Sequence, residues 1–393
     1  MPEFALSYSL GAASGEGKCA IEDECISIMP SMGEPLRIPF RDMLGVSPAD
    51  YKIAITLPKN TLILSGLGLK YEDFVRELFH ARNELTLKDM LMEDAKVIGR
   101  ARCPFSYVSE GKESKGECEA RVYETSLVIL PDSGELARIP FCEVSLFNQE
   151  GYSLVISTEY GEKLTLSALG RQMDPLRKAV SDAMNSLSLK TQKILKDAAP
   201  EAGPDEIAAA ARMMRDGRAA RRKSLDGISP AIWAGLRKKI EVAGLKDEYA
   251  FLESISEPAE MCIGVKRSLM GDMEGEYIWF LAPLKGKNVI AMEATSEESG
   301  RATYLFRVMP EKEFRGELSE ENILAGMRRI NRCMIAINFR REPVYLDEKS
   351  LGDPKYASYR FSIARLPQLR ELRSLFIGRA IHNEGWKRNV AGQ

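Results

Sequence analysis

Short runs of alternating apolar and polar residues, separated by turn residues, fill most of the first 190 residues. Alternation with a period of two is typical of strands that have one face in a core. The runs predict strands at 24–29, 36–40, 43–46, 51–57 and 62–67. A helix is expected next, because Phe74, Leu78, Ala81 and Leu85 recur at helical spacing. The first part of the chain is therefore predicted to be an antiparallel sheet followed by one amphipathic helix.

This pattern occurs twice. IMPSMGEPLRIPF at 28–40 aligns with ILPDSGELARIPF at 129–141, and YKIAITLPKNTLILSGLG at 51–68 aligns with YSLVISTEYGEKLTLSALG at 152–170. The offset is 101 residues in the first pair, and one extra residue in a turn makes it 102 in the second. The matches exceed what average residue usage gives by chance, so an internal duplication is the better explanation.

The second copy also ends in a predicted helix, which Asp174 can cap and whose first turn suits Pro175. Its apolar stripe consists of Leu176, Val180, Ala183 and Leu187. The helix is expected to continue to the breaker PEAGP at 200–204. A curled antiparallel sheet leaves an open end, and a helix with one apolar face can close it.

The order of elements and the frame I-P-F…Y-x-I…L-x-L-S-x-L-G resemble the pleckstrin-homology-like (PH-like) fold, in tandem over about 18–190. The tandem is similar to the N-terminal part of the archaeal taxis adaptor proteins called CheF, and PH-like pairs also occur in FACT-type histone chaperones. The resemblance implies modules that bind other proteins. The chain as a whole resembles uncharacterised prokaryotic proteins, which implies no activity.

The second half of the chain begins with predicted helices, at 207–223 and from Pro230 to about Gly244. From about 258 the pattern returns to strands, in the runs CIGVKRSLM, EYIWFLAPL, NVIAMEAT and RATYLFRVM. Ser319 can cap a further helix with an apolar stripe, and a last helical region is expected at 359–382, interrupted by Pro367.

The predicted fold class is therefore α+β. We expect two tandem PH-like domains, each an antiparallel sheet plus a C-terminal helix, at 1–95 and 96–200. A helical connector is expected at 201–257, and a separate C-terminal α+β domain at 258–393.

Charge divides unequally between the halves. The 55 Lys and Arg residues nearly balance the 57 Asp and Glu residues, which excludes a strongly basic nucleic-acid coat or an acidic tail as the character of the whole chain. Residues 1–190 hold 21 basic and 28 acidic residues, whereas residues 191–393 hold 34 and 29. An acidic partner would therefore be directed to the C-terminal half.

The seven cysteines contain no C-x-x-C pair, which favours free thiols in a reducing cytoplasm. The start Met1-Pro2-Glu3-Phe4 has no basic and apolar leader, and no run of 18 apolar residues follows, so we expect a cytoplasmic protein without a membrane span. Only two histidines occur, His80 and His382, and neither has a catalytic motif nearby. We therefore predict no enzyme activity, no catalytic residue, no metal site and no cofactor.

The segment AASGEGKC at 12–19 is one residue type away from a phosphate-binding loop. Such a loop needs a hydroxyl group on magnesium and a helix directly behind it, but Cys19 is a poor ligand for this hard cation and a strand is expected next. We interpret the segment as a flexible glycine-rich lead-in.

Phosphoinositide binding by a PH-like fold depends on basic residues around the loop between its first two strands. The predicted strands place these loops at 29–34 and 130–135, and neither segment contains a Lys or Arg. We therefore expect no phosphoinositide binding.

The densest group of guanidinium side chains comprises Arg328, Arg332, Arg340 and Arg341, with Arg329 beside them. Arginine suits bidentate capture of phosphate or carboxylate, so these residues are the candidate binding site. The competing interpretation, which we favour, is flanking charge beside an amphipathic helix. The basic run at 218–223 lacks interleaved aromatic residues and is expected to be a solvated helix face.

The sequence thus predicts a non-enzymatic cytoplasmic adaptor whose tandem PH-like modules bind protein partners, by strand addition or in a groove beside the helix. The alternative is nucleic-acid or phosphorylated-ligand binding through the basic C-terminal half. We do not favour nucleic acid as the partner.

Overall fold

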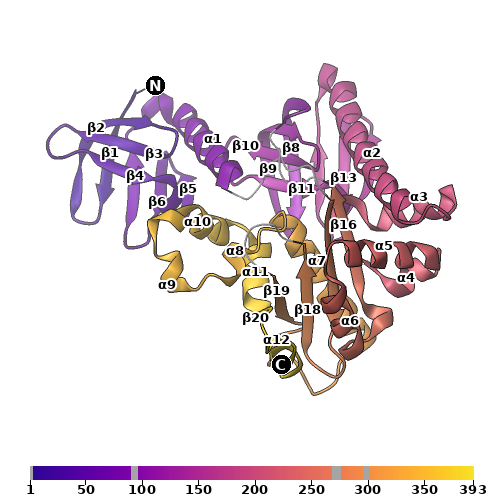
Figure 1. Ribbon diagram of the computed structural model, residues 1–393. Coiled ribbons are helices and arrows are strands. Elements are labelled where there is room, and N and C mark those ends of the chain that lie inside the picture. Colours follow the sequence, from indigo (N-terminus) through magenta and orange to yellow (C-terminus); the bar gives the residue numbers. More distant parts are fainter. Residues whose placement is uncertain (1–2, 90–95, 268–275, 296–300) are drawn as a thin grey trace. The chain divides into compact units, whose positions relative to one another are not determined.

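The computed structural model describes residues 3–89, 96–267, 276–295 and 301–393 (Figure 1). The chain forms two compact units. Unit 1 consists of Met1–Ser181 and Glu348–Arg365, and unit 2 consists of Asp182–Asp347 and Leu366–Gln393. The polypeptide therefore passes from one unit to the other three times.

Unit 1 contains the duplicated part of the chain, as two curled seven-stranded antiparallel sheets with the same strand order. The first sheet has the order β4-β3-β2-β1-β7-β6-β5 and the second has the order β11-β10-β9-β8-β14-β13-β12. A helix follows each sheet in the sequence. We call β1–β7 with α1 the first repeat, and β8–β14 with the unit 1 part of α2 the second repeat.

The elements of the first repeat are β1 (Glu3–Leu10), β2 (Ala13–Ile21), β3 (Cys25–Pro30), β4 (Leu36–Pro39), the 3-10 helix η1 (Phe40–Asp42), β5 (Gly45–Ala49), β6 (Lys52–Thr56), β7 (Thr61–Ser65) and α1 (Tyr71–Asp89). Those of the second repeat are β8 (Gly99–Ser109), β9 (Lys112–Val122), β10 (Ser126–Pro131), β11 (Ala137–Pro140), β12 (Val144–Glu150), β13 (Ser153–Thr158), β14 (Lys163–Leu166) and α2 (Met173–Ala198).

The predicted sheet-then-helix order is confirmed in both copies, but each sheet begins earlier than the sequence suggested. The prediction of a flexible lead-in at 12–19 is wrong, because Ala13–Ile21 form β2 and pair with β1. The first part of β2 is largely exposed, so it shows no alternation, whereas Cys19 is fully buried. A turn and then β3 follow β2, which excludes the helix that a phosphate-binding loop requires.

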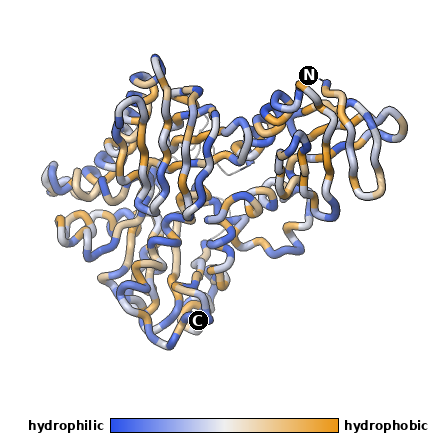
Figure 2. The backbone as a smooth tube through the Cα atoms, turned by 180° about the vertical axis from the view of Figure 1, so that it is seen from behind, coloured by the Kyte–Doolittle hydropathy of each residue, from blue (hydrophilic) through white to orange (hydrophobic). Residues whose placement is uncertain are grey.

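Unit 2 contains a third antiparallel sheet, with the order β15-β16-β17-β18-β19-β20. Its strands are β15 (Ala220–Arg221), β16 (Cys262–Arg267), β17 (Glu276–Pro283), β18 (Val289–Ala294), β19 (Ala302–Arg307) and β20 (Phe376–Ile381). The four strands predicted between 262 and 307 are confirmed, and Trp279 is a buried core residue as expected. Figure 2 shows hydrophobic segments recurring along the strands of both units.

Helices cover both faces of this sheet. On one face lie α3 (Pro204–Met213), α4 (Arg222–Asp226), α5 (Pro230–Val242), α6 (Lys246–Ile255) and α12 (Trp386–Ala391), which share one hydrophobic core with the strands. On the other face lie α7 (Glu320–Ala336), α8 (Glu342–Tyr345) and α11 (Pro367–Leu375). The boundary expected at residue 257 falls inside the shared core, so the helices at 204–255 pack as one layer of this domain.

Two predicted helices are wrong in their extent. The helix expected at 207–223 ends at Met213, because Asp216 and Gly217 have left-handed backbone angles, with φ of 53° and 85°. Residues after this break form the edge strand β15. The last helical region is also shorter than expected: α11 ends at Leu375, and the following FIGRAI forms β20 beside β19.

Residues 348–365 return the chain to unit 1. They form α9 (Glu348–Leu351), the 3-10 helix η7 (Pro354–Tyr356) and α10 (Ala357–Arg365). We call residues 348–365 the return segment. Its helix α10 packs against α1 and η1 of the first repeat.

Candidate functional site

Helix α1 belongs to the first repeat but also contacts the second. Phe74 and Leu78 lie in the core of the first sheet. Near the C-terminal end of α1, Leu87 packs against Tyr123 and Val128 of the second repeat. Because both contacts use the same rigid helix, α1 links the two repeats directly.

Polar contacts fix α1 to the turn between β10 and β11. The side-chain amide of Asn83 donates from Nδ2 to the carbonyl of Gly134 at 3.0 Å, and its Oδ1 accepts from the backbone N–H of Leu136 at 3.2 Å. Asn83 is fully buried, and both of its polar atoms are used. A one-residue shift of the helix along the turn would lose both bonds, so Asn83 sets the register of the contact.

Arg82 lies beside Asn83 and is fully buried. Its Nη1 is 2.6 Å from Glu135 Oε1 in the same turn, and its Nη2 donates to the carbonyl of Met43 at 3.3 Å. A buried guanidinium needs such partners, since an unpaired buried charge is strongly destabilising.

The return segment docks at the same place. Arg365 of α10 places Nη1 2.9 Å from Glu135 Oε1 and donates from Nη2 to the carbonyl of Met43. Two guanidinium groups, from α1 and α10, thus share one carboxylate and one carbonyl. Ser362 of α10 donates its hydroxyl to the carbonyl of Asp89, the last residue of α1. We call this contact region of α1, the β10–β11 turn and α10 the junction.

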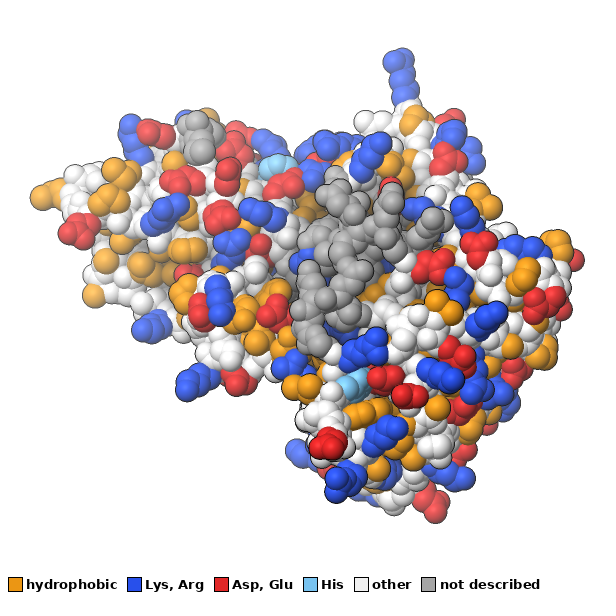
Figure 3. Space-filling view, viewed as in Figure 1, with side chains coloured by type: hydrophobic (Ala, Val, Ile, Leu, Met, Phe, Trp, Pro, Cys, Tyr) orange, Lys and Arg blue, Asp and Glu red, His pale blue; other side chains and the backbone are white. Residues whose placement is uncertain are grey.

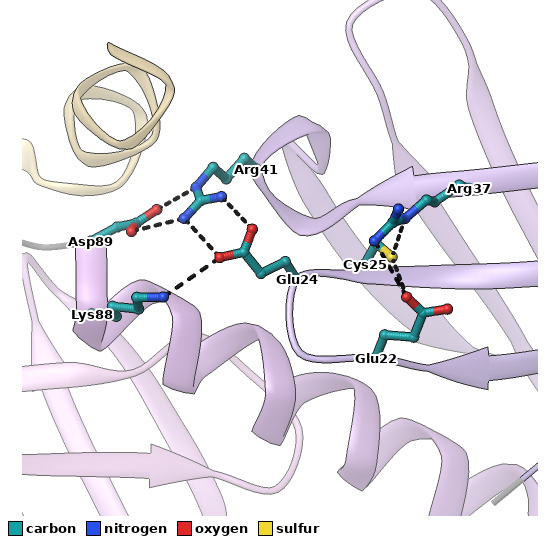
Figure 4. A network of polar contacts seen from close by, with 7 residues as sticks. All are labelled: Glu22, Glu24, Cys25, Arg37, Arg41, Lys88 and Asp89. Carbon is teal, nitrogen blue, oxygen red and sulfur yellow. Dashed lines mark hydrogen bonds and ion pairs between the residues drawn. The ribbon is translucent and has the colours of Figure 1, made fainter. Parts of the chain in front are cut away.

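A charged network supports the end of α1 (Figure 4). Arg41 of η1 makes two parallel bonds to Asp89, with Nε 2.6 Å from Oδ2 and Nη2 3.1 Å from Oδ1. Its Nη1 is also 2.9 Å from Glu24 Oε2, and Lys88 approaches the same carboxylate at 3.6 Å. The hydrogen bond to Asp89 raises the pKa of Arg41, and the one from Arg41 lowers the pKa of Glu24.

A second cluster in Figure 4 lies around the thiol of Cys25. The sulfur accepts from Arg37 Nε at 3.0 Å and donates to Glu22 Oε2 at 3.2 Å. Ser27 donates to the other carboxylate oxygen of Glu22 at 2.5 Å, and this bond is the largest cause of the lowered pKa of Glu22. The cluster ties the β2–β3 turn to β3 and β4.

The second repeat holds α1 by a further ion pair. Arg121 of β9 is 2.5 Å from Glu84 of α1 and 2.8 Å from Glu119 on its own strand. The hydrogen bond from Arg121 is the largest cause of the lowered pKa of Glu119. The junction is therefore an assembly of paired charges and backbone carbonyls, which suits it to hold a polypeptide segment.

The predicted binding residues lie in unit 2 and differ in their surroundings. Arg328 and Arg332 are one turn apart on α7, and Arg328 is the more exposed. Arg340 and Arg341 follow α7 after a left-handed turn. The guanidinium of Arg341 lies 5.1 Å from the centre of the Tyr304 ring, and Arg332 and Arg340 also have intramolecular contacts.

The basic run at 218–223 does not form one solvated helix face, because it follows the break after α3. Arg221 pairs with Glu260 at 2.8 Å and with Glu320 at 3.0 Å. Arg222 lies 3.2 Å from Glu253. Figure 3 shows Lys and Arg side chains interspersed with Asp and Glu over the viewed face of unit 2.

The structure gives His382 partners that the sequence did not indicate. Nε2 of His382 is 3.0 Å from Glu293 Oε1, and Nδ1 is 3.3 Å from Glu248 Oε1. The hydroxyl of Thr303 is 3.1 Å from Nε2. The centroid of the Trp386 ring lies 4.4 Å from the centroid of the His382 ring. These residues meet only because β18, β19 and β20 are neighbours, so sequence spacing carries no sign of the cluster. Its contacts join α6 to the sheet.

The described ranges contain neither a metal-binding cluster nor a membrane-spanning helix. No group of three or more His, Cys, Asp or Glu side chains there is arranged to hold a metal ion. No helix in these ranges is both long and apolar enough to cross a membrane.

Comparison with known proteins adds little. No family model matches the chain, and no curated protein matches it significantly. Among the solved structures that match is a chain of the Spt16D Pob3N heterodimer, with 14% sequence identity over 40% of this chain and 84% of that chain. The TM-score is 0.18, so this similarity carries no argument about fold or function.

Proposed function

We propose that the protein is a non-enzymatic cytoplasmic adaptor whose two tandem PH-like modules bind polypeptide partners. The single observation that carries the proposal is the capture of the return segment at the junction. A stretch of chain that is remote in sequence is held there by the carboxylate of Glu135 and by the main-chain carbonyls of Met43 and Asp89.

The chemistry of the junction favours a helical ligand that carries a guanidinium group and a hydroxyl group. The half-exposed carboxylate of Glu135 binds the guanidinium of Arg365. The Met43 carbonyl accepts a second hydrogen bond from the same guanidinium. The carbonyl of Asp89 accepts the hydroxyl hydrogen. Charge-assisted bonds of this kind give both orientation and affinity.

Each module also presents a large exposed aromatic residue at the corresponding hairpin. Tyr51, between β5 and β6, is 73% exposed, and Tyr152, between β12 and β13, is 89% exposed. Exposed aromatic side chains are frequent anchors of protein interfaces. The two tyrosines are therefore the residues that we propose for contact with a partner outside the chain.

The group of arginines in unit 2 supports the alternative less well. Arg332, Arg340 and Arg341 already have intramolecular contacts, so binding of nucleic acid or a phosphorylated ligand would have to displace them. A flat dependence of DNA, RNA or heparin retention on salt concentration removes this alternative, whereas a steep dependence favours it.

The junction can be tested with a variant in which a Gly/Ser linker of equal length replaces the return segment in the full chain. A labelled synthetic peptide of residues 348–365 should bind this linker variant saturably and the wild-type protein at least tenfold more weakly. The matched control is the same peptide with Ser362→Ala and Arg365→Ala, which should bind at least tenfold more weakly than the native peptide. Absence of saturable binding to a folded linker variant contradicts the proposal.

The adaptor role is tested by affinity capture from the native cell. Partners recovered with the wild-type protein should be lost with the double variant Tyr51→Ser, Tyr152→Ser. They should be retained with Val242→Ser, which alters an exposed apolar residue of unit 2. Recovery of the same proteins with all three would contradict the assignment of the two tyrosines, and recovery of none above background would contradict the adaptor role.

A further inference from the structure

Two cysteines of the second repeat face one another across neighbouring strands. In the antiparallel pair of β8 and β9, Cys103 is the register partner of Cys118. Directly opposite residues point to the same face of a sheet. Both side chains are directed into the core, with exposed fractions of 2% and 0%.

The register places the two residues at a separation that a disulfide can span. Opposite residues of antiparallel strands have Cα atoms about 4.5–5.5 Å apart, and disulfides join residues whose Cα atoms are about 4.4–6.8 Å apart. Closing the bond therefore needs little movement of the backbone. Both cysteines are free thiols in this structure.

The two thiols also differ in character. A hydrogen bond from Cys118 lowers the pKa of Cys103, whereas the same contact, followed by burial, raises the pKa of Cys118. Cys103 is also the less completely buried of the two, so we take its thiol as the one that reacts first with an oxidant. Cys118 is placed to react second.

The first repeat provides an internal comparison. In its sheet the buried thiol of Cys19, on β2, faces Phe4 of β1, whose ring packs against Phe74 with centroids 5.0 Å apart. Burial raises the pKa of Cys19 to about 12. Among the paired strands of the described residues, the register sets two cysteines opposite each other only at Cys103 and Cys118.

We propose that Cys103 and Cys118 form a reversible redox modification site that takes a small peroxide as its oxidant. The thiolate of Cys103 attacks one oxygen of hydrogen peroxide, the O–O bond breaks, and one water leaves after protonation, which gives a sulfenic acid. The sulfur of Cys118 then attacks the sulfur of Cys103, its proton goes to the departing hydroxyl, and a second water leaves. Two thiols and one peroxide yield one disulfide and two waters.

A small oxidant suits the burial of the pair. A brief local separation of β8 and β9 would have to admit only a molecule of about the size of water. Reduction by a dithiol restores the starting state by thiol–disulfide exchange. The inference is independent of the proposed adaptor function.

The test uses the wild-type full-length chain, because trypsin places the two cysteines on separate peptides, residues 103–112 and 116–121. After treatment with hydrogen peroxide and alkylation of free thiols, mass spectrometry should find these peptides linked, with a loss of two hydrogens. Dithiothreitol should release them. Failure to find this link, or oxidation that stops at sulfinic acid, overturns the proposal.

Three variants separate the roles. Cys118→Ala should give no linked peptide and should accumulate a sulfenic acid at Cys103 that dimedone captures. Cys103→Ala should give neither product. The matched control is Cys19→Ala in the first repeat, which should form the 103–118 link to the same extent as wild type. A link to another cysteine in place of Cys103–Cys118 contradicts the assignment.

Discussion

Glu135 shows how the cost of a substitution depends on what it leaves behind. The carboxylate is half-exposed, but both guanidinium groups that bind it are buried, Arg82 completely and Arg365 largely. Removing Glu135 therefore leaves two buried cations without their carboxylate. Removing Arg82 leaves a carboxylate that water and Arg365 can still satisfy.

We predict that Glu135→Ala lowers the free energy of unfolding by about 3–5 kcal/mol. Arg82→Met keeps most of the buried volume and should cost clearly less. The exposed pair of Glu113 and Lys115 supplies the control, since Glu113→Ala should leave the free energy of unfolding close to that of wild type. Urea denaturation of the three variants measures the differences, and equal costs for Glu135→Ala and Arg82→Met would contradict the argument.

Tyr277 carries a hydroxyl that is buried without a hydrogen-bond partner among the described residues. Tyr277→Phe should leave the free energy of unfolding at pH 7 unchanged or raise it by about 1 kcal/mol, because it removes an unsatisfied polar group. The ring contact with Phe339 is retained in this variant.

The same tyrosine predicts a loss of stability at high pH. Burial raises its pKa to about 12, above the ordinary value of 10. The stability that the folded state gains by keeping Tyr277 protonated is fully present below pH 10. It is lost as the pH rises from 10 through 12. Wild type should therefore lose more stability than Tyr277→Phe between pH 9 and pH 11.5, and parallel curves would contradict this. Tyr249, with a pKa also raised by burial to about 12, accounts for loss that remains in the variant.

At the scale of elements, a glycine sets how closely two helices of unit 2 approach. A Cβ atom on Gly235 of α5 would lie 2.2 Å from the carbonyl oxygen of Ala198 at the end of α2. Backbone cannot yield as a flexible side chain does, so Gly235→Ala should destabilise the protein by about 1–3 kcal/mol.

Gly378→Ala on β20 is the matched control for Gly235→Ala, since no atom lies within 4 Å of its added Cβ. Thermal denaturation should show a lower melting temperature for Gly235→Ala alone. An unchanged melting temperature for Gly235→Ala would show that α2 and α5 separate easily.

Some helices and strands could be predicted from the sequence, and others could not. The repeat and the strands from β3 to β7 followed from alternation, because each buries one face in its own core. The strand β2 was missed because Ala13–Lys18 are largely exposed and rich in glycine. The break after α3 depends on the backbone of Asp216, a residue type that tolerates left-handed angles but does not require them.

The candidate site was less predictable than the fold. Asn83, Glu135 and Arg365 form the junction, yet they come from three segments that no periodicity connects. His382 and Glu293 meet through strand pairing in the same way. Charge density along the sequence pointed instead to the arginines of α7, because local composition reports neighbours in sequence and not neighbours in space.

At the scale of the whole molecule, the return segment makes each unit depend on a distant part of the chain. We predict that the linker variant defined above exchanges backbone hydrogen faster in the last two turns of α1 and in the β10–β11 turn. Exchange in β16 to β18 should stay as in wild type, because these strands pack within unit 2. Hydrogen–deuterium exchange with mass spectrometry measures both, and unchanged exchange at 82–89 would contradict the role of the segment.

The three crossings of the chain also affect how the protein is made. Unit 1 needs Glu348–Arg365, which the ribosome adds about 180 residues after Ser181. At roughly 5–20 residues per second, this is a delay of about 10–40 s. During that time Glu135 and Arg82 are present, but Arg365 has not yet been made. The N-terminal tandem is therefore made long before the segment that completes its assembly.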